Sequence, residues 1–172
     1  LRDPRPADAA EHQSALAGRG TTRFTWSGEL DPTRLSPSLV RIDMNGDVEM
    51  LHKALDGSVG MLSADRMEIL AEDPDAAATG DGTSSLGISA MDLRQIEAIG
   101  GVYVATETRR VDCDHIDYDL RTGIARLEAA TGQTLAIVTE GSPYPVRATS
   151  VVWNMDPAID TITIHGLRGT GG

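Results

Sequence analysis

Hydrophobic and polar residues alternate along several short runs of this chain, as they do in strands that have one buried face. In the first run, the even-numbered positions of 40–50 are apolar or glycine and the odd-numbered positions are charged or polar. Asn45 and Gly46 lie in the middle of this run and are typical of a two-residue hairpin turn. Such a turn would place Arg41 opposite Met50, a charged side chain against an apolar one. We therefore predict one continuous strand with Gly46 on its inner face.

The same alternation recurs over 96–104, again with a glycine, Gly100, on the apolar side. Each of these runs is followed by a second run in which the apolar positions shift by one residue partway along. One extra residue at a fixed place in a strand is typical of a β-bulge. Repeated shifts predict an antiparallel meander whose repeats stack one apolar face on the next. The shifts occur at Asp65-Arg66, at Asp114-His115 and, in a third copy, at Thr149-Ser150.

Glycines at the predicted connections suit hairpin loops. Residues 55–57 fit a three-residue loop, and the run 119–123 supplies a four-residue loop, 120–123, with its glycine last. With these loops, apolar residues of neighbouring strands lie opposite each other. Further strands are predicted at 135–139 and 161–165, and a turn at Asp156-Pro157 is predicted between Trp153 and Ile162. The predicted fold class is therefore all-β.

The rest of the chain lacks this alternation. The first residues mix Pro, Ala, Arg and Gly, although Asp8 and Glu11 fit the capping box of a short helix. Residues 72–85 have the composition of an acidic surface loop. A length of 172 residues suits one domain. The predicted division is a tail at 1–23, a single β-domain at 24–168 and a Gly-rich tail at 169–172.

Composition excludes several classes of protein. The formal net charge is −11 and Lys53 is the only lysine, so nucleic acid is not an expected partner, because binding phosphates requires clustered cations. No apolar run approaches the roughly twenty residues of a membrane helix. Residues 1–6 lack the apolar stretch of a secretory signal, so we interpret the chain as a mature form or an excised part. Aromatic residues make up only 3%, so the core must be aliphatic.

Candidate chemical sites are weak. Residues 112–119 contain four carboxylates and a histidine, which are potential ligands of a cation. Neighbouring side chains of a strand point to opposite faces, so we expect the polar side chains of this run to lie on a solvated outer face instead. We expect His12, His52 and His165 to be surface or edge residues. The single cysteine, Cys113, forms no internal disulfide, and motifs for a serine nucleophile or a phosphate loop do not occur. We predict no catalytic residue, metal or cofactor, although the paired acids of a carbohydrate-active enzyme can meet from distant positions.

Two pairs of runs carry a resemblance to a known family. The first is Met44-Asn45-Gly46-Asp47-Val48-Glu49-Met50 with Leu62-Ser63-Ala64-Asp65-Arg66-Met67-Glu68-Ile69. The second is Ala98-Ile99-Gly100-Gly101-Val102-Tyr103-Val104 with Val111-Asp112-Cys113-Asp114-His115-Ile116-Asp117-Tyr118-Asp119 and Thr122-Gly123. Together they resemble the repeat of the OstA-like lipopolysaccharide-transport proteins, over roughly residues 38–165. The chain departs from that repeat at Cys113, at Thr149, where the family has Asp, and in its long acidic loop.

The resemblance implies a fold and a function. The fold is a folded-over antiparallel sheet, a half-open β-jelly roll or β-taco built from stacked hairpin repeats. Its inner face holds the acyl chains of lipopolysaccharide or a similar lipid, and its open ends pair with related β-domains to form a bridge across the periplasm. We therefore expect a periplasmic or cell-envelope protein that docks through its edge strands, including to a second copy of itself.

An aliphatic inner face is physically sufficient for such a role, because burying one methylene group contributes about 0.8 kcal/mol. The alternatives that remain open are a structural β-repeat scaffold filled by its own side chains and, less favoured, an enzyme on a β-framework. The candidate groove residues are those on the apolar parity of the repeats: Val48, Met50, Leu62, Met67, Ile69, Val102, Val104, Ile116, Tyr118, Val151 and Trp153.

Overall fold

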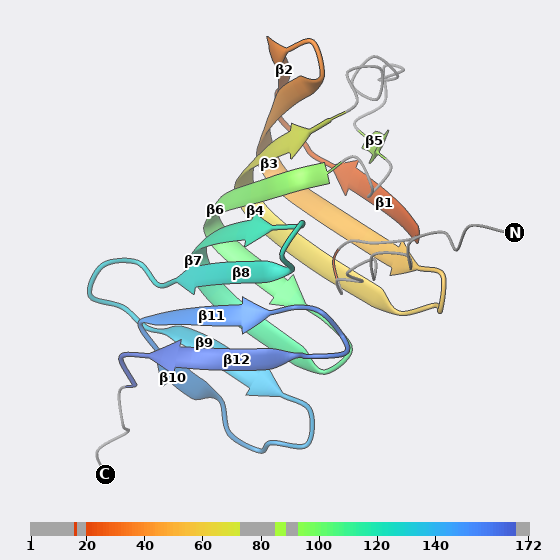
Figure 1. Ribbon diagram of the computed structural model, residues 1–172. Coiled ribbons are helices and arrows are strands. Elements are labelled where there is room, and N and C mark those ends of the chain that lie inside the picture. The colour runs from red at the N-terminus through yellow and green to blue at the C-terminus, as the bar shows by residue number, and fades with distance from the viewer. Residues whose placement is uncertain (1–15, 17–19, 73–84, 89–92, 168–172) are drawn as a thin grey trace, which may run out of the picture.

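The computed structural model describes residue 16 and residues 20–72, 85–88 and 93–167 (Figure 1). Within this part of the chain, twelve strands form one sheet. The strands are β1 (Gly20–Thr25), β2 (Leu30–Ser36), β3 (Leu39–Ala54), β4 (Val59–Ala71), β5 (Ser85–Ile88), β6 (Leu93–Ala105), β7 (Arg109–Asp119), β8 (Ile124–Glu128), β9 (Leu135–Thr139), β10 (Val146–Ala148), β11 (Ser150–Asn154) and β12 (Thr161–His165). The described residues contain no helix long and apolar enough to span a membrane.

All strand pairs of the sheet are antiparallel. The strand order is β12-β11-β8-β7-β6-β4-β3-β1-β5, with β2 beside β3, β9 beside β7 and β10 beside β9. β12 and β5 stand at opposite ends and do not pair, so the sheet is not closed into a barrel. The predicted fold class, an all-β folded-over antiparallel sheet of stacked hairpins, is confirmed.

β3 runs through Asn45 and Gly46 without turning back, as the burial argument predicted. Asn45 pairs with Arg66 and Val48 with Ala64, so two residues of β3, Gly46 and Asp47, stand opposite a single residue of β4. Both have a positive φ, 85° at Gly46 and 44° at Asp47. This is a bulge in which glycine supplies the left-handed backbone.

The second repeat has the same bulge in β6. Gly100 and Gly101 have φ values of 82° and 52° and stand opposite Asp114 of β7. The extra residues therefore lie on β3 and β6, whereas the sequence pattern placed them on β4 and β7. The predicted shift of apolar positions in β4 is nevertheless present, because Ala64 and Met67 are both buried.

The predicted hairpins are confirmed. Gly57 has a φ of 90° and Gly123 a φ of 71° in their loops. The registers follow from these loops: Met50 pairs with Leu62 across the first, and Tyr118 with Ala125 across the second.

The sheet folds over along the line of bulges, because bulges bend the strands that contain them. Residues 39–44 of β3 pair with β2, and residues 49–54 pair with β1. Residues 115–119 of β7 pair with β8, and residues 109–112 pair with β9. The two halves of each long strand thus belong to two layers. The first layer includes β2, β8, β11 and β12, and the second includes β1, β5, β9 and β10; Figure 1 shows β11 and β12 in front of β9 and β10.

The third repeat is split between these layers. β8 and β9 take the place of one long strand and are separated by residues 129–134. Opposite them, the chain changes partner at Thr149, because Ala148 pairs with β9 and Ser150 pairs with β8. The predicted shift at this point is confirmed. Val146 has the same parity as the buried Ala148, but it is 38% exposed because β10 is an edge strand.

The predicted tail ends earlier than residue 23. β1 begins at Gly20 and pairs with β3, and its residues Thr22 and Phe24 are buried. The polar residue at the inward position 22 concealed the alternation of this strand. Leu16 also belongs to the core, with 0% exposure. The rest of the predicted helix near Asp8, most of the acidic loop (73–84) and the Gly-rich end lie outside the described residues.

Candidate functional site

The predicted groove residues all face the space between the two layers. Each of them is 1% exposed or less, and all belong to one hydrophobic core cluster. The sequence pattern therefore identified the inner face correctly. In this structure, however, the inner face is covered, so an acyl chain reaches these residues only if the layers separate.

The inner face also contains a buried histidine. His52 has 0% exposure, and its Nδ1 lies 2.9 Å from Oγ1 of Thr22 on the neighbouring strand. Burial lowers the pKa of His52, and the negative charge of Asp56 opposes that shift. The expectation of a surface or edge position was wrong for His52. Its even number continues the apolar parity of 40–50, which was the signal for an inward position.

A second buried polar group on the inner face is the hydroxyl of Tyr118. The side chain is fully buried, and its hydroxyl has no hydrogen-bond partner among the described residues. Burial raises the pKa of Tyr118, and the nearby charges of Asp119 and Asp156 act in the same direction. A buried hydroxyl without a partner costs about 1–3 kcal/mol. The inner face is thus aliphatic with a small number of polar atoms.

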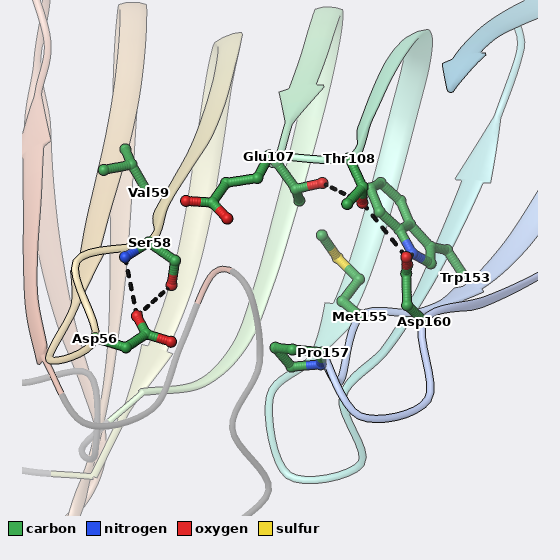
Figure 2. Close-up of a pocket in the computed structure, with 10 residues that line it drawn as sticks. Asp56, Ser58, Val59, Glu107, Thr108, Trp153, Met155, Pro157 and Asp160 are labelled. Atoms are coloured by element: carbon green, nitrogen blue, oxygen red, sulfur yellow. Dashed lines mark hydrogen bonds between the residues drawn. The ribbon is translucent and has the colours of Figure 1, made fainter. Parts of the chain in front are cut away.

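A cleft lies where the free ends of the two layers meet (Figure 2). Its cavity volume is about 160 Å³. Trp153 and Met155, which line the cleft, also belong to the hydrophobic core. Side chains of the core therefore form part of the floor of the cleft. Its lining comes from the β3–β4 loop, the β6–β7 loop and the β11–β12 region: Asp56, Ser58, Val59, Thr106, Glu107, Thr108, Trp153, Met155, Pro157 and Asp160.

The rim of this cleft is acidic. Asp56, Glu107 and Asp160 contribute carboxylates from three different loops (Figure 2). Asp56 accepts hydrogen bonds from the hydroxyl and the backbone N–H of Ser58, at 2.6 and 2.9 Å, and these bonds lower its pKa. An anionic group approaching the cleft meets like charge.

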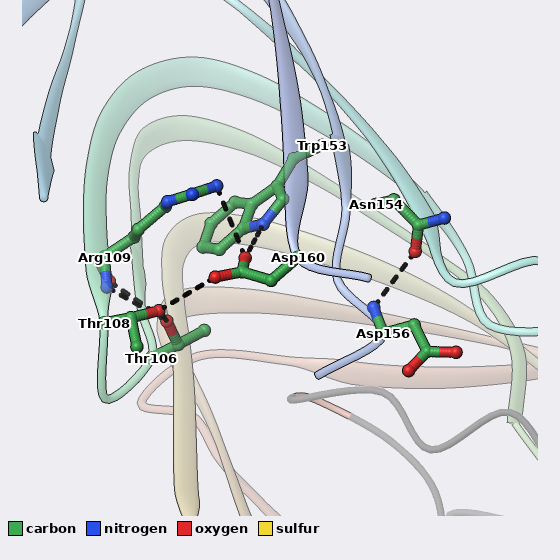
Figure 3. Close-up of polar contacts among 7 residues, drawn as sticks. All are labelled: Thr106, Thr108, Arg109, Trp153, Asn154, Asp156 and Asp160. Atoms are coloured by element: carbon green, nitrogen blue, oxygen red, sulfur yellow. Dashed lines mark hydrogen bonds and ion pairs between the residues drawn. The ribbon is translucent and has the colours of Figure 1, made fainter. Parts of the chain in front are cut away.

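Asp160 connects the two layers beside the cleft (Figure 3). Its Oδ1 accepts a hydrogen bond of 2.9 Å from Nε1 of Trp153 and lies 3.3 Å from Nη1 of Arg109. Its Oδ2 accepts a bond of 3.3 Å from the hydroxyl of Thr108. The Arg109 guanidinium lies 5.9 Å from the centre of the Trp153 ring, within range of a cation–π contact. Arg109 and Thr108 belong to the second layer, and Trp153 and Asp160 to the first.

The amino-acid sequence does not predict this contact. Asp160 follows Arg109 by about fifty positions, and no local pattern joins them. The backbone of Asp160 is left-handed, with a φ of 37°, which is uncommon outside glycine and which Asp tolerates better than most residues. The sequence contains no signal for that conformation.

The polar run 112–119 lies mainly on the outer face, as expected. Asp112 and Asp114 are exposed, and His115 lies 2.9 Å from Oε1 of Glu97 and 3.8 Å from Oε2 of Glu128 on the adjacent strands. Among the described residues, no group of three or more His, Cys, Asp or Glu side chains is arranged to hold a metal ion. Cys113 is half-buried, and burial raises the pKa of its thiol to about 12.

The two ends of the sheet present edge strands. Among the described residues, β12 pairs only with β11, and β5 pairs only with β1. On β12, Ile162 and Ile164 face the core but are only partly buried. The C-terminal edge thus combines free backbone hydrogen-bonding groups with apolar side chains.

Comparison with protein-family models and with curated proteins finds no match to this chain.

Proposed function

We propose that this chain is a non-enzymatic lipid-binding protein of the cell envelope or periplasm. In this proposal it carries or bridges lipopolysaccharide, or a comparable lipid, by holding acyl chains between its two layers. The observation that carries the proposal is the continuous aliphatic inner face of an open, folded sheet, formed by Val48, Leu62, Val104 and Ile116 among others. The resemblance of the repeats to the OstA-like proteins supports the same function.

The energetics are compatible with this function. An acyl chain that buries about twelve methylene groups gains on the order of 10 kcal/mol before ordering costs. Part of that gain offsets the contacts that the layers lose when they separate. Because the lining is aliphatic and closely packed without a ligand, we expect chains of different lengths to bind with similar affinity per methylene.

The edge strands support a bridging role. β12 and β5 can each accept another strand by backbone hydrogen bonding, from a related β-domain or from a second copy of the chain. Ile162 and Ile164 would extend the aliphatic face into such a partner. Light scattering over a concentration series tests this; a chain that stays monomeric at millimolar concentration argues against self-docking.

The complete burial of the inner face favours a second candidate, a structural scaffold whose interior is filled by its own side chains. The scaffold and the lipid carrier share a fold and differ in whether the interior opens. A measurement of ligand contact at a buried position therefore separates them.

Photocrosslinking at neighbouring positions of β6 provides that measurement. A diazirine-bearing aliphatic amino acid replaces Val104, which is buried, or Tyr103, which is half-buried and points the other way. With lipid A or a long-chain fatty acid present, a lipid carrier gives an adduct from position 104 and much less from position 103. Equal labelling, or none from position 104 at saturating lipid, supports the scaffold.

A further inference from the structure

The cleft between the layers and the contact made by Asp160 lie side by side (Figures 2 and 3). We propose that this cleft is the lateral entrance through which an acyl chain reaches the interior, and that Asp160, held by Arg109 and Trp153, keeps the entrance closed. The inference rests on the proposed lipid-binding function and assigns to it a route and the residues that control the route.

The lining of the cleft is suited to the end of an acyl chain. Trp153 and Met155 are core residues, and Val59 and Pro157 add apolar surface from both sides. The cavity volume of about 160 Å³ is similar to that of an apolar cavity that accommodates benzene, so the terminal five or six carbons of a chain fit. A whole chain does not fit, and its insertion must push the layers apart.

The charge of the rim sets the direction of insertion. Asp56 and Glu107 are exposed carboxylates at the mouth of the cleft. They disfavour the passage of an anionic headgroup and leave the apolar tail as the part that enters first. The headgroup then stays outside the sheet while the chain slides inward.

Asp160 closes this entrance because its contacts join opposite layers. The carboxylate of Asp160 accepts a hydrogen bond from Trp153 of the first layer. It also accepts one from Thr108 of the second layer and forms an ion pair with Arg109 of that layer. Separation of the layers at the cleft breaks the contacts with Arg109 and Thr108. Asp160 also has a left-handed backbone, which this set of contacts holds in place. The energy of these contacts therefore contributes to the barrier to uptake.

The test is the rate of uptake of an uncharged probe, a fluorescent long-chain alcohol, followed by stopped-flow mixing. Asp160→Asn removes the charge opposite Arg109 and keeps an oxygen that accepts from Trp153. Asp112→Asn is the matched control, because it removes an equal charge from an exposed position of β7 that lies outside the lining of the cleft. We expect D160N to take up the probe roughly three- to tenfold faster, the size expected when a partly buried contact with a charged group is weakened. Its affinity should rise by no more than the same factor, because the contact is lost only in the state in which the layers are apart. We expect D112N to match the native chain.

The outcomes separate the two levels of the proposal. Equal uptake rates in the native chain, D160N and D112N, with normal binding, overturn the assignment of Asp160 and leave the lipid-binding function standing. No binding of the probe, or of lipid A, by any variant overturns the lipid-binding function itself. If D160N does not fold, Thr108→Val removes one exposed hydroxyl from the same contact and should accelerate uptake by a smaller factor; an unchanged rate in T108V then overturns the assignment.

Discussion

Replacement of Gly100 by alanine tests whether the bulges shape the sheet. Gly100 has a φ of 82°, and a Cβ added there would lie 2.5 Å from Oδ2 of Asp65 on the neighbouring strand. Two separate costs follow: the left-handed backbone, and the displacement of the Asp65 carboxylate. Gly57 provides the matched control, because its φ is 90° but nothing lies within 4 Å of its added Cβ.

The expected magnitudes differ accordingly. Residues held in unfavourable backbone conformations cost about 1–3 kcal/mol each, so Gly57→Ala should destabilise the protein by about 1 kcal/mol. Gly100→Ala should cost about 2–4 kcal/mol, since the collision with Asp65 adds to the backbone cost. For a domain of this size, each kcal/mol of destabilisation lowers the melting temperature by about 2–4 °C.

Urea unfolding followed by circular dichroism measures both variants. The double variant Gly100→Ala with Asp65→Ala removes the collision and keeps the backbone cost, so the alanine at position 100 should cost less in that background. The reasoning is refuted if G100A is no more destabilising than G57A, or if removal of the Asp65 carboxylate leaves the cost of G100A unchanged.

Three further predictions concern single side chains. Tyr118→Phe should stabilise the ligand-free protein by about 1–3 kcal/mol because the buried hydroxyl has no partner among the described residues, whereas the same change at the exposed Tyr144 should be neutral in urea unfolding; a destabilised Y118F would mean that the hydroxyl is satisfied. Because burial lowers the folded pKa of His52, the unfolded chain binds a proton first as the pH falls, so stability should decrease from pH about 6.5 downward, and His52→Gln should reduce that dependence between pH about 7.5 and 5.5. An unchanged pH dependence in H52Q would contradict the buried, neutral state. Cys113, with a pKa of about 12, should react with a thiol reagent at pH about 8 far more slowly in the folded protein than in urea, and equal rates would argue against its burial.

The sequence predicted the sheet well because alternation and turn chemistry are local. Alternation of apolar and charged residues predicts a continuous strand and not a hairpin at Asn45 and Gly46, and the loop lengths predict the pairing of Met50 with Leu62. The same parity also placed every proposed groove residue inward. A one-residue shift of the apolar positions does not show which of two neighbouring strands contains the extra residue. The sequence pattern therefore placed the bulges on β4 and β7, whereas they lie on β3 and β6.

The remaining features depend on contacts between distant segments. Whether the inner face is open or covered depends on how closely two layers approach, which alternation does not encode. The contact of Asp160 with Arg109 arises only after the sheet folds over. β1 was missed because one of its two inward residues, Thr22, is polar, which leaves Phe24 as the only apolar residue of a short strand.

Quenching of Trp153 by a brominated fatty acid tests the central claim most directly. Trp153 is 1% exposed and lies where the cleft meets the core, and a Trp26→Phe background leaves it as the only tryptophan. If acyl chains enter between the layers, bromine on the chain will quench the Trp153 fluorescence in a saturable way, while the unbrominated acid at the same concentration will not. Unquenched Trp153 at concentrations well above those at which fatty-acid carriers saturate would contradict the claim that the interior holds lipid.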